Sequence, residues 1–187
     1  MRVIRLPVVI CLLCIGPPAI AAQAASQDEF RVYTEHPKLL LRPQRLRLLK
    51  RERERQSMRW KQFEALISGG AAMPEPGFAW ALFHAITGDA KTGKLAVEWA
   101  LGPGTDVRQL AIVFDWCQDA MAEKQSEALG AKIQKAIAQR GGSDMITQRN
   151  RAWAAIAIAE QNMDFSEKVL REVVEQWWRR GVADALE

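Results

Sequence analysis

The sequence predicts an all-α fold built from antiparallel helical hairpins. Apolar residues recur at spacings of three and four along most of the chain, which is the period of an amphipathic helix. Gly- and Pro-rich turns divide this pattern into helix-length segments, as expected for hairpins packed side by side. No stretch alternates apolar and polar residues long enough to predict a strand. The 187 residues are 49% hydrophobic and 26% charged, which fits one globular domain and excludes a disordered or fibrous chain.

Residues 1–24 have the three parts of a secretory signal peptide. Arg2 and Arg5 precede a short apolar core, and Pro17 and Pro18 separate that core from a run of small residues. Cleavage after Ala24 fits an A-x-A site, and cleavage after residue 21 is the alternative. The apolar core is shorter than the roughly 20 residues that span a bilayer. We therefore expect a periplasmic or secreted protein without a stable membrane anchor after cleavage, and an uncleaved anchor is the other interpretation.

The first half of the remaining chain predicts an extended segment and five helices. Residues 25–42 form the entry segment, and residues 43–187 form the helical domain. Pro43 suits the first turn of a helix that reaches about residue 56. The next helix carries Trp60 and Phe63 and ends at Gly69. Further helices are expected over 78–87, stopped by Gly88, over 90–101, and from a cap at residue 105 or 106 to 117.

The second half predicts three more helices. Residues 122–139 are amphipathic, and glycines follow them. Residues 149–161 form the next predicted helix, and Ser166 is the expected cap of the last one. The adjacent Trp177 and Trp178 carry a large apolar area near the end of the sequence. They pack either on the preceding helices or on further helices or another domain beyond this chain.

The net charge and the small number of histidines and cysteines limit the kinds of ligand that this chain is expected to bind. Removing Arg2 and Arg5 with the signal leaves 24 basic against 22 acidic residues, a net charge of +2 that argues against a nucleic-acid-binding protein. Residues 42–61 nevertheless hold nine basic side chains, which form either a solvated helix face or a surface that attracts an acidic polymer. Only two histidines and one cysteine follow the signal, so we expect no metal and no cofactor. We expect Cys117 and His84 to be buried, and His36 to lie on the entry segment before Pro37.

A polar cluster at 148–153 is the best local candidate for binding an anion. Arg149, Asn150 and Arg151 are expected to open the helix that continues through Trp153. Hydrogen-bond donors at a helix N-terminus suit an anion such as a carboxylate. A polar cap flanked by surface arginines is the simpler interpretation.

Three motifs, in order, resemble the heparinase II/III-like and alginate-lyase-type polysaccharide lyases. The first is His-Pro-Lys-Leu-Leu-Leu-Arg-Pro at 36–43, followed by a basic, leucine-bearing helix. The second, Phe-His-Ala-Ile-Thr-Gly-Asp at 83–89, is similar to the "ALTGD" helix end of that family. The third, at 109–119, is similar to its "LAxxYDWxxD" helix. The match continues to Asn150 and spans about residues 33–178.

The resemblance implies part of an (α/α)6 toroid and β-elimination of a uronate-containing acidic polysaccharide such as alginate or a heparin-like glycan. It places Asn150 as the catalytic residue that neutralises the uronate carboxylate. Arg149, Arg151, Trp153 and Trp116 are then the substrate-binding residues. The family's histidine position is occupied by Arg151, and Tyr33 is the only tyrosine, so the base and acid of the elimination are expected outside this chain.

These departures predict an incomplete toroid that is inactive alone. It would be the N-terminal part of an exported lyase that lacks a C-terminal half or a β-sandwich domain. The alternative is a non-enzymatic periplasmic helical-hairpin module that binds protein or glycan.

Overall fold

A computed structural model describes residues 32–139 and 141–183; the predicted signal peptide lies outside these ranges. The described residues form helices and no strand, which confirms the all-α prediction. The first five helices are α1 (Pro43–Glu54), α2 (Met58–Ser68), α3 (Pro76–Thr87), α4 (Ala90–Leu101) and α5 (Val107–Trp116). A short 3-10 helix, η1 (Gln118–Ala120), leads to α6 (Glu123–Gln139), α7 (Met145–Ala157) and α8 (Met163–Arg171). The last helix continues as a π-helix, η2 (Glu172–Ala183).

Local sequence signals account for most helix ends. Proline occupies the first turn of α1 and of α3, where its missing N–H costs nothing. The Ser57 side chain caps α2, and the carboxylates of Asp89 and Asp106 cap α4 and α5. Gly88 ends α3 with a φ of 73°, a left-handed conformation that suits glycine. The predicted bounds of these helices are confirmed to within about two residues.

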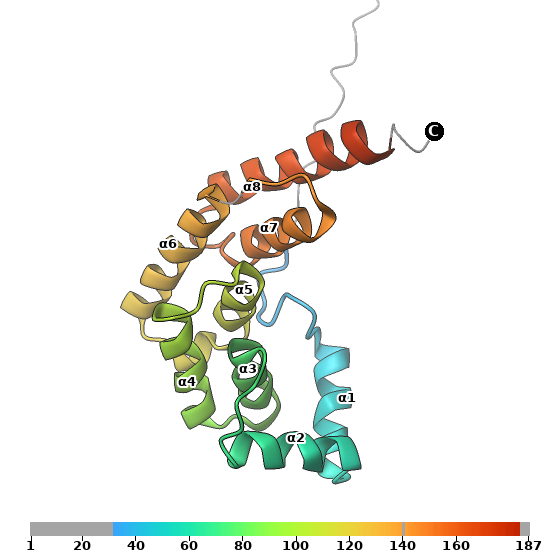
Figure 1. Cartoon of the computed structure of the whole chain (residues 1–187), viewed down its shortest axis with the longest axis vertical. Coiled ribbons are helices and arrows are strands. Elements are labelled where there is room, and N and C mark those ends of the chain that lie inside the picture. Colours follow the sequence, from blue (N-terminus) through green and yellow to red (C-terminus); the bar gives the residue numbers. More distant parts are fainter. Residues whose placement is uncertain (1–31, 140, 184–187) are drawn as a thin grey trace, which may run out of the picture.

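The helices pack as antiparallel neighbours in two layers. Helices α3, α5 and α7 lie side by side, and α4, α6 and α8 pack outside them (Figure 1). The chain forms an open arc, with α1 and α2 at one end and η2 at the other (Figure 1). Helix α5 occupies the centre of the core, since nine of its ten residues are buried.

Small residues set the distances between helices in places. Gly77 on α3 lies against the Trp99 ring of α4, where an added Cβ would come within 2.3 Å of the ring. Gly130 on α6 likewise leaves room for the side chain of Gln161. Helix α1 is different, because none of its residues is buried and only Leu46 and Leu49 reach the core.

Two predicted helix starts are wrong. Helix α7 begins at Met145 rather than at residue 149, because the Asp144 carboxylate accepts the backbone N–H of Thr147 at 2.9 Å. Helix α8 begins at Met163, where Asn162 accepts the N–H of Phe165, so Ser166 lies inside the helix and is buried. In both cases a capping side chain, Asp144 or Asn162, sets the helix start four residues before the start that the sequence predicted.

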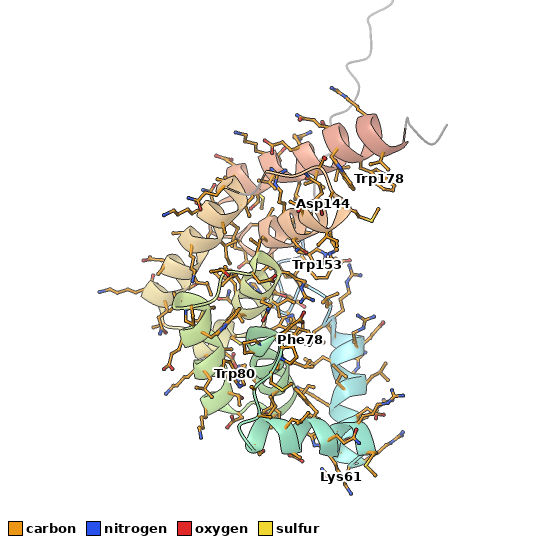
Figure 2. The ribbon with its side chains drawn as sticks, viewed as in Figure 1. Lys61, Phe78, Trp80, Asp144, Trp153 and Trp178 are labelled. Atoms are coloured by element: carbon orange, nitrogen blue, oxygen red, sulfur yellow. The ribbon has the colours of Figure 1, made fainter. Side chains whose placement is uncertain are left out.

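The two adjacent tryptophans, Trp177 and Trp178, differ in their burial. Trp177 is half-buried against the core and donates its indole N–H to the Ser143 carbonyl, whereas Trp178 is 46% exposed. Figure 2 places Trp178 on the last helix, close to the Asp144 end of α7. The inward packing of this pair is therefore confirmed for Trp177 alone. Within the described ranges, no helix is both long and apolar enough to span a membrane.

Candidate functional site

The buried carboxylate of Asp115 holds the entry segment onto α5. Asp115 is 1% exposed and lies near the C-terminal end of that helix. Its two oxygens accept hydrogen bonds from the backbone N–H groups of Lys38 and Leu39, at 3.0 and 2.7 Å. The same carboxylate accepts a third bond from His36 Nδ1 at 2.6 Å. A buried carboxylate needs such donors, because desolvation without them is costly.

Further contacts attach this segment to neighbouring elements. The Trp116 indole N–H donates to the Leu39 carbonyl at 2.9 Å. The buried ammonium group of Lys38 pairs with Glu160, after α7, at 2.9 Å. His36 Nε2 lies 3.5 Å from the other Glu160 oxygen. The segment is thereby fixed between α5 and the end of α7. His36 lies outside any helix, on the stretch before α1.

The second histidine forms a similar pair with the next carboxylate along the chain. His84 is 5% exposed on α3, and its Nε2 lies 2.8 Å from Asp119 Oδ1 on η1. Its Nδ1 lies 3.0 Å from the Asp89 carbonyl oxygen. Both ring nitrogens thus lie within hydrogen-bonding distance of an oxygen atom, so the ring is held from both sides. The prediction of a buried His84 is confirmed.

Both histidine–carboxylate pairs line one cleft of about 800 Å³. The entry segment and the ends of α3 and α5 form its floor, and α1 forms one wall. Lys50 and Arg53 project into the cleft from α1, beside Glu54. Arg53 reaches across to the Ile86 carbonyl of α3 at 3.5 Å. Neither cation pairs with a carboxylate in the part of the chain that the structure describes.

Burial and neighbouring charges shift the pKa values of several groups in and next to the cleft. The hydrogen bond to Asp115 raises the pKa of His36 above its ordinary value of 6.5, although partial burial and Lys38 oppose it. Partial burial opposes ionisation of Glu160, but the nearby Lys38 and His36 outweigh it and lower the pKa of this carboxyl group. Burial raises the pKa of the Cys117 thiol, next to Trp116, to about 12, with a further contribution from Asp119. The expected burial of Cys117 is confirmed.

The residues predicted to bind a uronate carboxylate lie on α7, away from this cleft. Asn150 sits in the second turn of α7 and not at the helix N-terminus, since the helix begins at Met145. Its amide oxygen accepts from Arg149 at 3.0 Å, and it borders a cavity of about 30 Å³. Such a cavity has about the volume of one water molecule. Arg151 pairs with Glu172 at 2.7 Å.

The two predicted tryptophans belong to different pockets. Trp116 lies in the floor of the large cleft, mostly buried and packed on Phe78. Trp153 lines a second pocket on the other side of the entry segment, with the Arg149 guanidinium 5.2 Å above its ring. Figure 2 shows Trp153 at the base of α7, above Phe78. The structure thus separates the five predicted site residues rather than gathering them in one groove.

The sequence interpretation did not identify the carboxylates that organise the cleft. Asp115 and Asp119 fall in the motif at 109–119, and His36 and His84 fall in the other two motifs. Residues from all three motifs line this cleft. The motifs were therefore the sequence signal that could have identified these four residues as one site. Among residues 32–139 and 141–183, no three His, Cys, Asp or Glu side chains are placed to hold a metal ion.

Comparison with known proteins gives no further assignment. The chain matches no family model, no curated protein and no solved structure.

Proposed function

We propose that this chain is the helical N-terminal part of an exported polysaccharide lyase and that it binds a uronate-containing acidic glycan in the cleft beside α1. The observation that carries this proposal is the cleft itself. It is large enough for sugar units, and two unpaired cations and both histidines of the chain line it. The described fold of antiparallel helices agrees with part of an (α/α) toroid.

The composition of α1 favours an anionic ligand. Arg45, Arg47 and Arg51 are exposed on the same helix as Lys50 and Arg53. Like charges on one helix repel one another, and a bound polyanion lowers this electrostatic repulsion. A glycan with a carboxylate on each repeat would meet this wall at successive turns. Guanidinium groups also match the planar carboxylate in geometry.

Under this proposal, the chain by itself binds the glycan and does not cleave it. The histidine nitrogens in the cleft are already engaged by Asp115, Asp119 and the Asp89 carbonyl, so they are poorly placed to take a proton from a sugar. Asn150 stays a prediction as the carboxylate-neutralising residue. In the lyase its partners, including the base and acid, would come from a further half or a β-sandwich domain.

Binding of alginate, heparin and a neutral glucan to the purified protein tests the proposal. The Lys50→Gln/Arg53→Gln variant should bind the preferred acidic glycan about tenfold more weakly, because two partly exposed charge contacts of about 0.7 kcal/mol each sum to about 1.4 kcal/mol. The matched control is Arg47→Gln/Arg51→Gln, which removes the same charge from the same helix outside the cleft. Equal losses in both variants would point to general charge attraction and reject the cleft.

Absorbance of the unsaturated uronate product should stay at baseline in the same samples. Appearance of product would mean that the chain carries a complete catalytic site.

One observation favours the alternative of a module that binds another protein. Met145, Ile146 and Trp178 are 63%, 63% and 46% exposed, and η2 packs against α7. An exposed apolar edge of this kind suits a protein partner. Under that alternative, none of the three glycans binds, and an Ile146→Glu substitution abolishes the complex with the partner while the Lys50→Gln/Arg53→Gln variant retains it.

A further inference from the structure

A second pocket lies across the entry segment from the large cleft. Its volume is about 320 Å³, and residues 38–40 line it, whereas residues 36 and 37 line the cleft. Consecutive residues of one short segment thus line the two pockets, which places them next to each other along the chain. Figure 1 shows this segment passing between α7 and α1. A single extended ligand could therefore reach both.

The second pocket combines aromatic rings with guanidinium groups. Tyr33 and Trp153 line it, and Tyr33 is 65% exposed. The Arg42 guanidinium lies 4.8 Å above the Tyr33 ring, and Arg149 lies 5.2 Å above the Trp153 ring. Arg149 already donates to Asn150, whereas the N–H groups of Arg42, held over the Tyr33 ring, can still donate to a ligand. Arg42 makes no ion pair with any residue of the described ranges, so its charge is available.

The backbone beside this pocket is strained. Leu40 has a φ of 57°, and the N–H of Leu41 bonds to the Leu39 carbonyl at 2.5 Å, which closes a tight turn around Leu40. Leu39 and Leu41 are 5% and 2% exposed, so the core fixes both sides of the turn. Leu40 is thereby held outward at the pocket rim, 37% exposed. Strain maintained by the surrounding structure is a mark of a binding site.

We infer that this pocket is a second subsite of the same glycan, which takes an anionic pyranose ring between Tyr33 and Trp153 and pairs its carboxylate with Arg42. The inference rests on the proposed function and deepens it. The C–H face of a pyranose is apolar and packs on an aromatic ring, whereas its carboxylate accepts two parallel N–H bonds from a guanidinium. Lys38 lines the pocket but is committed to Glu160, so Arg42 is the cation that selects the charge.

The inference predicts that affinity depends on glycan length. A disaccharide fills the large cleft alone, whereas a hexasaccharide engages both sites. We expect the alginate hexasaccharide to bind the wild-type chain at least about tenfold more tightly than the disaccharide. Arg42→Gln and Trp153→Ala should each remove most of that gain and leave disaccharide binding unchanged. The control is Arg55→Gln, which removes an exposed charge next to α1 outside both pockets.

The outcomes separate this inference from the proposed function. If neither alginate nor heparin oligosaccharides bind the wild-type chain, both fail. If the disaccharide binds but the hexasaccharide binds no tighter, or if Arg42→Gln keeps the full gain, the second subsite is refuted while the cleft stands. A hexasaccharide that carries sulfate esters and no carboxylates tests the anion: equal affinity for it would overturn the assignment to a carboxylate. Arg42 is exposed, so its variant should fold normally, and thermal unfolding verifies this.

Discussion

Replacing Asp115 with Ala should strongly destabilise the protein. The substitution removes the acceptor of two buried backbone N–H groups, those of Lys38 and Leu39, and of the His36 ring. Removing one partner of a buried charged network costs about 3–5 kcal/mol, because the other groups keep their desolvation penalty without a bond. A domain of this size has a total stability of about 5–15 kcal/mol, so the loss is a large fraction of it.

Urea unfolding followed by tryptophan fluorescence measures this effect. Asp119→Ala is the matched control, since Asp119 also bonds a histidine and lies four residues further on, but its side chain is 76% exposed. Because Asp119 is itself exposed, water can take its place beside the buried His84, so the control should cost at most about 1 kcal/mol and shift the midpoint little. Similar small shifts for both variants would refute the argument that Asp115 anchors the entry segment.

Three further predictions concern pH, the thiol and one close approach. The bond to Asp115 raises the pKa of His36, so protonated His36 stabilises the fold fully below its ordinary pKa of 6.5. This stabilisation is lost as pH rises through the pKa of His36 in the folded state. Between about pH 6 and 9, the urea midpoint should therefore fall more for the wild type than for His36→Gln. With Cys11 and Cys14 replaced by Ser, Cys117 should resist a thiol reagent at pH 8 and react fully in urea, since its pKa is about 12 and it is buried; labelling of the folded chain at the unfolded rate would contradict this. Gly77→Ala should cost about 1–3 kcal/mol by forcing a methyl group against Trp99, whereas Gly141→Ala, in open space, should change the unfolding free energy by less than about 0.5 kcal/mol.

The sequence predicted the helices well where an end signal was explicit. The proline of α1, the glycine after α3 and the aspartate caps of α4 and α5 each act within one turn, so local pattern sufficed. It failed at α7, where Asp144 is the cap but Gly141 and Gly142 just before it favoured the prediction of a longer loop. That single error moved Asn150 from a helix N-terminus into the second turn.

The candidate site was harder to predict, because its organising contacts are distant in sequence. Asp115 meets Lys38 and Leu39 across 77 and 76 residues, and no local pattern encodes that meeting. The sequence did single out both histidines and Trp116 as residues of interest. Their partners depended on how α3 and α5 pack, which is a property of the whole core. Tyr33 had no assignable role until the fold placed it in the same pocket as Trp153.

The lack of buried residues in α1 means that the cleft wall can open without unfolding the helical array. Helix α1 is held by Leu46 and Leu49 and by the entry segment that precedes it, whereas α5 is enclosed on all sides. Amide hydrogens of α1 should therefore exchange with solvent through local opening, far faster than those of α5, which exchange only when the core unfolds. Ligand entry would then depend on a small free-energy difference confined to one helix.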